Sequence, residues 1–384
     1  MPLTRKPNPT ALHPNPYQHG DEIWEAYNQC LSLEQHEGWN TFAAQLQKDV
    51  SEGIMNDLSP RVAARVLGWA LRVAPSDEGR NALVREIVGC NDDPELLAGL
   101  AHLSMLPTIT ASDVPPVYNP KGPTPSVSAT QSPRIAFQQA AQDLEHLLPK
   151  PSITAQDLRQ LLLYRDNHSC VFTGAVDLDS ARSDNTLIID LGVRTDTTRV
   201  AHIISQSLSE NIAGTTPAVC AKFEWAKTAG AIIERFGGFS SRDILSDNVL
   251  NSPLNAFTAA TAPHEEYDKL DLWLTAVDDG QGGIIPDTYD VQYYWGERLR
   301  SSVGIKQRIT FKTATVGNTT IPPPHPRLIT LHAACAMIAH MSGAAEHLKE
   351  CFRDTDMISV MTEPNAAYEL TRALKTLQLV SPTV

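Results

Sequence analysis

Residues 255–268 read NAFTAATAPHEEYD, and this stretch predicts a short strand that runs directly into a helix. Its apolar first half favours the strand, and the helix is expected over 263–277. Pro263 suits the first helical position, and the two glutamates behind His264 suit the positive end of the helix dipole. His264 and Asp268 stand four residues apart and so project from one helix face. An imidazole and a carboxylate placed this way can bind a single divalent cation and leave positions open for water and substrate.

A second histidine lies upstream, in the predicted strand RVAHIIS at 199–205. His202 can act as a base near neutral pH, and the amide of Asn255 could fix the orientation of that base. Taken alone, a strand histidine is more often a structural residue, and Asp268 could equally be a surface acid paired with a neighbour. The order of His202, Asn255, His264 and Asp268 along the chain favours a catalytic site, or a site with a catalytic origin.

The order and spacing of these motifs resemble the HNH endonuclease family. More narrowly, they resemble the subgroup with a C-x-x-T-G opening, an A-H-I motif, and an asparagine followed nine residues later by H-x-x-x-D. The resemblance covers about 155–350. It rests on these segments: RDNHSCVFTG at 165–174, VAHIIS at 200–205, NAFTAATAPHEEYD at 255–268 and ITLHAACAMIAHMSGAAEHL at 329–348.

The resemblance implies a ββα-metal finger that holds one divalent ion at a phosphodiester of DNA. His202 would be the general base, and Asn255 would position that histidine or the loop between the strands. His264 would be a metal ligand, and Asp268 a second ligand or a residue that holds a water. Mg²⁺ is the favoured ion, with Mn²⁺, Ni²⁺ and Zn²⁺ as alternatives, and the ion would stabilise charge on the phosphate and the leaving oxygen.

Two departures from the family pattern keep other functions open. Ala201 stands where many HNH nucleases place a metal ligand, although the A-H-I subgroup shares the alanine. The helical run at 205–248 must be an insertion between the two strands, which is acceptable because loop-closure cost grows slowly with length. One alternative is a degenerate HNH scaffold that acts as an interaction or regulatory module. Another is an adaptor in which the N-terminal module 21–106 binds a protein partner.

The domain organisation follows from changes in composition along the chain. Five segments are expected: a disordered arm at 1–20, a helical module at 21–106, a Pro-rich linker at 107–133, an HNH domain with preceding helices at 134–320, and C-terminal helices at 321–384. Helices are predicted at 80–89, 94–106, 134–148, 154–164, 218–236, 240–247, 326–352 and 365–379, with a further helix after Ser59-Pro60. Short strands are predicted at 170–174 and 186–193, and mixed β-structure at 284–313. The fold class is therefore α+β, with a ββα-metal finger flanked by helical N- and C-terminal regions.

The charge of the chain argues against a general nucleic-acid coat protein. The formal net charge is −13, and residues 160–315 hold fourteen Lys and Arg against twenty Asp and Glu. Phosphate affinity comes largely from basic side chains. A local basic segment at 290–312 could contact a few phosphates, although a solvated hairpin with ordinary charges is as good an interpretation; its candidate substrate-binding residues are Arg298, Arg300, Lys306 and Arg308. Any DNA binding should be weak and salt-sensitive.

Several other classes of protein are disfavoured. The six cysteines are scattered without a C-x-x-C pair, which argues against a thiolate zinc site and a disulfide scaffold. The sequence contains no G-x-S-x-G elbow, no phosphate-binding P-loop and no G-x-G-x-x-G fingerprint. His340 and His347 lie two helical turns apart, too far for one ion, so they and His332 are expected to be packing or polar-face residues. We expect an intracellular protein, cytoplasmic or nuclear, that is neither secreted nor membrane-bound. The oligomeric state stays open.

Overall fold

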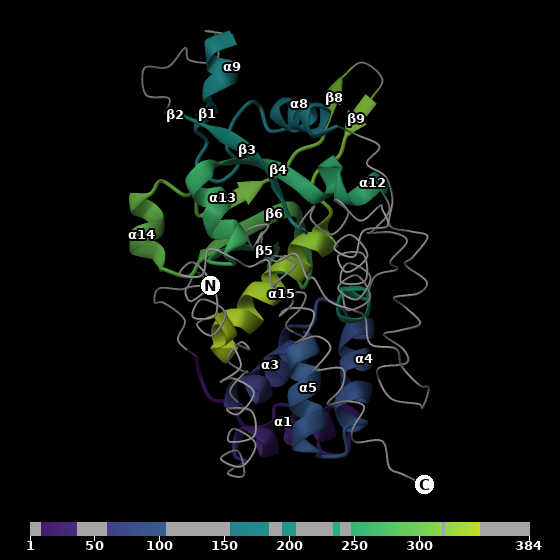
Figure 1. The fold of residues 1–384 in the computed structure, drawn as a ribbon. Coiled ribbons are helices and arrows are strands. Elements are labelled where there is room, and N and C mark those ends of the chain that lie inside the picture. The colour runs from purple at the N-terminus through teal and green to yellow at the C-terminus, as the bar shows by residue number, and fades with distance from the viewer. Residues whose placement is uncertain are drawn as a thin grey trace, which may run out of the picture.

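The computed structural model describes residues 9–36, 60–104, 154–183, 194–204, 233–238, 247–316 and 319–345 (Figure 1). It is an α+β structure of helices and small sheets, as the sequence predicts. The linker 107–133, the expected helices at 134–148 and 365–379, the expected strand at 186–193 and most of the insertion at 205–248 lie outside the described residues. Within the described part, no helix is long and apolar enough to cross a bilayer.

Four helices of the described residues form a bundle in the lower part of Figure 1. The helices are α1 (Glu22–Glu34), α3 (Pro60–Val73), α4 (Asp77–Val88) and α5 (Pro94–Ser104). Apolar residues at helical spacing bury one face of each helix, and Ser76 caps α4 by accepting a hydrogen bond from the Gly79 amide at 3.0 Å. The predicted helices in this region are confirmed.

The arm expected to be disordered is packed from residue 9 onward. Leu12 is 7% exposed and belongs to the bundle core, and its amide donates to Glu34. Tyr17 donates its hydroxyl proton to the Leu71 carbonyl at 3.3 Å. The expectation of disorder is therefore wrong for 9–20. Leu12 and Tyr17 pack onto the bundle, although Pro, Asn and His dominate the composition of this segment. Residues 1–8 lie outside the described part.

The upper part of Figure 1 carries the strands. Strand β3 (Thr198–His202) pairs antiparallel with β4 (Ala256–Ala260), which follows a short 3-10 helix η3 (Pro253–Asn255). Helix α13 (Thr261–Asp268) begins at the end of β4. The helices α8 (Ala155–Arg165) and α12 (Asp247–Leu250) lie around this unit. Two small strand pairs complete this part: β1 (Val176–Asp177) runs parallel to β2 (Thr195–Asp196). The strand β8 (Ala314–Val316) runs antiparallel to β9 (Thr319–Ile321). Helix α9 (Leu178–Ser183) follows β1.

A three-stranded sheet extends the same core, and it corrects two predictions. Its strands are β5 (Leu272–Asp278), β6 (Ile284–Tyr293) and β7 (Arg308–Thr310), in the order β5-β6-β7. The helix expected over 263–277 ends at Asp268, and its second half is β5, because Leu270 takes a left-handed conformation with φ 61° and stops the helix. Within the expected β-structure at 284–313, residues Glu297–Ser302 form the short helix α14.

A further correction concerns the CVFTG segment at 170–174. It forms a turn instead of the expected strand, closed by a 2.8 Å hydrogen bond from the Gly174 amide to the Cys170 carbonyl. Gly174 has φ 74°, a conformation that a β-strand does not use.

Helix α15 (Pro326–Ser342) joins the two parts of the molecule. It contacts both β5 and α3, and its residues belong to both hydrophobic cores. Gly343 ends the helix with φ 89°, in the left-handed conformation that suits glycine at this position. The helix expected at 326–352 is therefore interrupted at Gly343, and residues 346–352 lie outside the described part.

Candidate metal centre

The pairing of β3 with β4 joins two segments that are far apart in sequence. His202 is the last residue of β3 and lies opposite Ala256, the first residue of β4. The Ile203 amide donates to the Asn255 carbonyl at 2.8 Å, which extends the pairing by one step beyond the strands. His202 and Asn255 therefore lie at the same end of one strand pair.

Asn255 is fully buried and fastens the chain that follows His202. Its side-chain oxygen accepts from the Ile204 amide at 2.9 Å, and its side-chain nitrogen donates to the Ile204 carbonyl at 2.8 Å. The same nitrogen donates to the Leu250 carbonyl at 2.9 Å. Three hydrogen bonds thus tie Asn255 to the chain that follows His202 and to Leu250.

Ala201 and His202 differ in their surroundings. Ala201 is completely buried in the core that also contains Phe257, and His202 is half-buried. The alanine therefore serves packing, and the position before His202 is enclosed by apolar groups. A carboxylate there would be costly unless a cation compensated for its charge.

A buried ion pair, which was not predicted from the sequence, is hydrogen-bonded to the backbone of β4. Arg165 and Asp166 are adjacent in sequence, and Arg165 Nε lies 2.8 Å from Asp166 Oδ1 with both side chains almost fully buried. Arg165 donates to the carbonyls of Pro253 and Ala256 at 2.8 and 2.9 Å, and Asp166 accepts from the Thr258 amide at 2.7 Å. The signal available in the sequence was an Arg-Asp pair directly after the apolar stripe of a helix.

Asp177 anchors the other end of β3. It accepts from Thr198 Oγ1 at 2.5 Å and from Arg159 Nη2 at 3.0 Å, and it also accepts from the amide and hydroxyl of Ser180. Burial acts to raise the pKa of Asp177, but the hydrogen bonds and the charge of Arg159 outweigh it and lower the pKa below the ordinary value of 3.8. His168 is half-buried, and its Nδ1 lies 2.9 Å from Ser180 Oγ.

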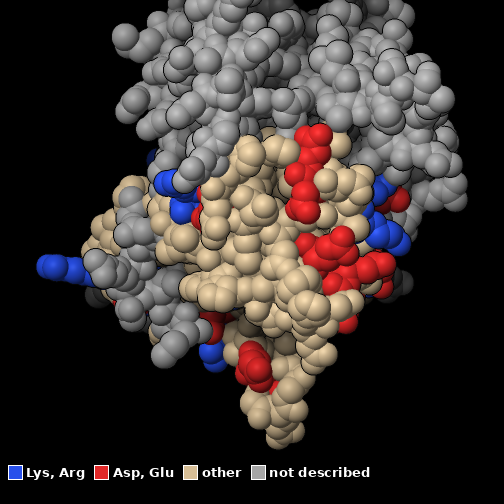
Figure 2. All heavy atoms as spheres, turned by 90° about the horizontal axis from the view of Figure 1, so that it is seen from below, with Lys and Arg blue, Asp and Glu red and all other residues tan. Residues whose placement is uncertain are grey.

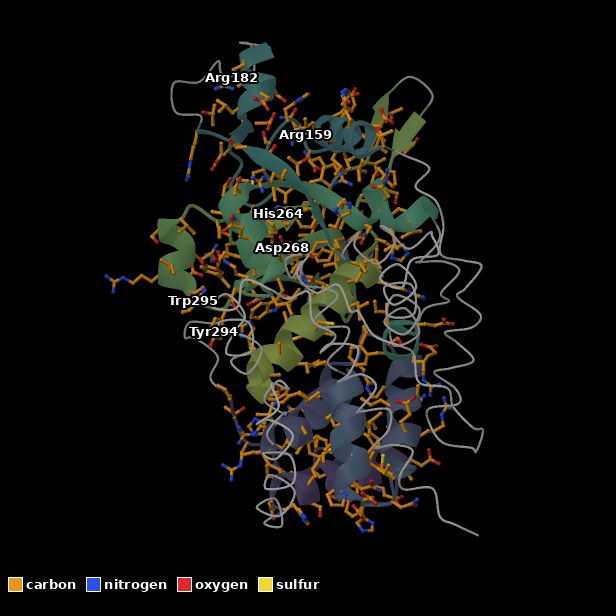
Figure 3. All side chains as sticks on the ribbon, viewed as in Figure 1. Arg159, Arg182, His264, Asp268, Tyr294 and Trp295 are labelled. Carbon is orange, nitrogen blue, oxygen red and sulfur yellow. The ribbon has the colours of Figure 1, made fainter. Side chains whose placement is uncertain are left out.

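Helix α13 packs against both strands and holds the proposed ligand pair. Tyr267 anchors the helix in the core, with its ring 5.1 Å from that of Phe257. On α13, His264 Nε2 lies 3.2 Å from Asp268 Oδ2 (Figure 3). The two side chains are 13% and 18% exposed, so water still reaches the pair. The structure thus brings these two predicted residues together.

The spacing of this pair fits two neighbouring ligands of one small divalent ion. In octahedral coordination with bonds of about 2.1 Å, adjacent ligand atoms are about 3.0 Å apart. The 3.2 Å between His264 Nε2 and Asp268 Oδ2 is close to that value. Among the described residues, no group of three or more His, Cys, Asp or Glu side chains is placed to hold an ion. An ion bound by this pair would complete its coordination with water and substrate.

The basic residues expected to bind substrate are mostly engaged within the protein. Arg300 is 5% exposed, donates to the Ile305 carbonyl at 2.9 Å and pairs with Glu297. Arg308 pairs with Asp290 at 2.7 Å, and Lys306 donates to the Val171 carbonyl at 3.2 Å. Arg298, by contrast, is exposed. The burial of Arg300 corrects its expected place on an accessible β-surface.

His332 and His340 pack α15 against the end of α13, as expected from their spacing. His332 stacks on Tyr267 with ring centroids 3.8 Å apart and contacts the Tyr267 carbonyl through Nε2 at 3.2 Å. Burial lowers the pKa of His332 to about 3, and the hydrogen bond to Tyr267 opposes that shift only in part. His340 lies 3.0 Å from the Leu270 carbonyl. His347 lies outside the described residues.

Comparisons of the chain with protein-family models, with curated proteins and with solved structures give no match. Function is therefore inferred from the residues and geometry of the site itself.

Proposed function

We propose that this protein is a metal-dependent endonuclease of the HNH type that hydrolyses phosphodiester bonds of DNA. The observation that carries the proposal is the His264–Asp268 pair at 3.2 Å, on the helix that directly follows the strand pair bearing His202 and Asn255. The two strands and the helix would then be the ββα-metal finger, and residues 205–248 would be the insertion between its strands.

In the proposed reaction, each residue has one role. His264 and Asp268 hold the divalent ion, with Mg²⁺ as the favoured metal. The bound ion would supply Lewis-acid stabilisation of charge on the phosphate and the leaving oxygen. His202 takes the proton from the attacking water, because a neutral imidazole can accept a proton at physiological pH. Asn255 is a positioning residue, since its three hydrogen bonds fix the chain next to His202.

Substrate binding would be weak and sensitive to salt. The formal net charge of −13 supports this expectation, and the bundle end of the described surface, seen from below, carries more Asp and Glu than Lys and Arg (Figure 2). Three of the four basic candidates already bond to other parts of the protein, although Lys306 and Arg308 remain partly accessible. The contribution of the metal to phosphate binding should therefore be large.

The proposal is tested by nicking of supercoiled plasmid DNA with Mg²⁺ or Mn²⁺, with and without chelator. His202→Ala should lower the nicking rate by about 10²–10⁴-fold, which is the usual worth of a general base. His264→Ala and Asp268→Asn should abolish metal-dependent nicking. His19→Ala is the matched control, because His19 is an exposed histidine of the bundle region. A folded His202→Ala protein that nicks DNA as fast as the parent would refute the role of His202.

The second candidate function is an HNH-like scaffold that acts as an interaction or regulatory module. Two observations favour it. Ala201, at the position where many HNH nucleases place a metal ligand, is buried in the apolar core. Arg300 is paired with Glu297, and Arg308 with Asp290. The scaffold would neither bind a divalent ion through His264 nor nick DNA under any of these conditions.

A further inference from the structure

Helix α14 carries the short run ERLRSS at 297–302, in which two serines follow two arginines. Arg298 stands three residues before Ser301, and Arg300 stands directly before it. Of all the serines in the sequence, Ser301 alone has an arginine at the third position before it. Many protein kinases select a serine by the basic residues on its N-terminal side, which pair with carboxylates of the kinase. The run therefore has the charge pattern of an acceptor for such an enzyme.

The groups that a kinase would recognise are open to solvent. Helix α14 lies at the margin of the strand-rich half, away from the bundle (Figure 1). Arg298, Ser301 and Ser302 are all exposed. Arg298 and Ser301 are three residues apart, so they lie on the same side of the helix. Arg298 forms no ion pair with any residue that the structure describes. A kinase can therefore reach both the acceptor hydroxyl and the arginine that identifies it.

The acceptor segment can leave its helix at little cost. A kinase cleft takes an extended segment, so α14 must open locally. The helix has six residues, and helices this short are marginal on their own. Arg300 is its only buried residue, held by Glu297 and by the Ile305 carbonyl at 2.9 Å. Glycines with positive φ flank the helix, Gly296 at 85° and Gly304 at 75°. Opening the segment exposes little apolar core, which keeps the free energy of local unfolding low.

We propose that Ser301 is a phosphorylation site for an arginine-directed protein kinase. In the reaction, Ser301 Oγ attacks the γ-phosphorus of ATP, and the bond from that phosphorus to the ADP oxygen breaks. The hydroxyl proton passes to the catalytic aspartate of the kinase. The inference is independent of the proposed nuclease activity, because it uses only the sequence, the exposure and the hydrogen bonds of α14.

The added phosphate should open α14. Ser301 Oγ lies 3.3 Å from Glu297 Oε1, so a phosphate on this oxygen brings about two negative charges beside a carboxylate. The hydrogen bond from Arg300 holds the pKa of Glu297 below its ordinary value of 4.5, so this carboxylate is ionised at neutral pH. The phosphate would also lie at the C-terminal end of the helix, where negative charge is unfavourable. The exposed Arg298 offsets little of this repulsion.

The experiment incubates the folded full chain with ATP, Mg²⁺ and the catalytic subunit of cyclic-AMP-dependent protein kinase, and mass spectrometry of peptides locates the phosphate. We expect phosphate on Ser301. Ser301→Ala should abolish the phosphorylation of this peptide, whereas the matched control Ser302→Ala should keep it, because Ser302 is an exposed neighbour without an arginine at the third position before it. Arg298→Ala should lower the initial rate by about 10–150-fold, the usual worth of a hydrogen bond to a charged group.

Three results would overturn the inference: no phosphate on Ser301 in the parent, phosphate there only after thermal unfolding of the chain, or an equal initial rate in Arg298→Ala. Hydrogen exchange tests the effect of the phosphate on the helix. The amides of Val303 and Gly304 donate to the Leu299 and Ser301 carbonyls at 3.1 Å, and they should exchange faster in the phosphorylated protein. Unchanged exchange after full phosphorylation would overturn the opening of α14.

Discussion

The helical bundle and the strand-rich half of this protein bury different kinds of groups. In the bundle, α1, α3, α4 and α5 meet through apolar side chains such as Tyr27, Leu67 and Leu71, all fully buried. Around β3 and β4, the buried groups include Arg165, Asp166 and Asn255, each bonded to backbone of distant segments. Apolar packing tolerates small shifts, whereas buried polar bonds specify one arrangement. The difference indicates that the proposed site is held by directional bonds and the bundle by packing.

The largest stability effect should come from removing the buried cation beneath β4. Arg165→Met leaves Asp166 as an uncompensated buried carboxylate and frees three backbone carbonyls. The free energy of unfolding in urea should fall by about 3–5 kcal/mol. Arg182→Met, which removes an exposed pair with Asp179, should change it by less than about 1 kcal/mol. A similar loss of unfolding free energy in both variants would contradict the idea that buried polar bonds hold the strand-rich half together.

The contact between the two halves can be tested at a helix glycine. A methyl group at Gly79 of α4 would overlap the backbone oxygen of Phe236, a residue that packs against both cores. Gly79→Ala should lower the free energy of unfolding by about 1–3 kcal/mol. Gly68→Ala is the control, because its methyl group would meet only the flexible end of Leu12 at 2.6 Å and alanine favours the helix. If Gly68→Ala destabilises the protein more, the contact at Phe236 is not a rigid one.

The smallest effect is a pH dependence that arises at His332. Its pKa is about 3 in the folded protein and 6.5 in an unfolded chain, so between these values only the unfolded state binds the proton. The contribution of His332 to the free energy of unfolding is therefore fully present above pH 6.5. It is lost as the pH falls, by about 2 kcal/mol between pH 7 and 5. His332→Gln should flatten the curve of unfolding free energy against pH in that range, and His19→Gln should not. An unchanged slope in His332→Gln would place the acid sensitivity elsewhere.

The helices and the two strands of the site were predictable because local patterns determine them. The predictions for α3, α4, α5, α8, β3 and β4 match within a few residues. The residues after Asp268 were read as helix, since a short apolar run such as LDLWLTAV fits both periods and only the left-handed Leu270 decides between them. The pair His264–Asp268 followed from helical spacing alone. The clamp of Arg165 and Asp166, and the anchoring of β3 by Asp177, depend on contacts between segments distant in sequence, which periodicity does not encode.

A titration with Mn²⁺ tests most directly whether His264 and Asp268 form a metal centre. We expect the parent chain to bind one ion, detected by electron paramagnetic resonance of free Mn²⁺ and by calorimetry. Loss of an outer-shell partner alone costs about 10–100-fold in metal affinity, so His264→Ala and Asp268→Asn should each weaken binding at least that much, while His19→Ala should bind as the parent does. Binding of Mn²⁺ that is equally tight in the parent and in His264→Ala, or no binding by the parent, would contradict the metal centre.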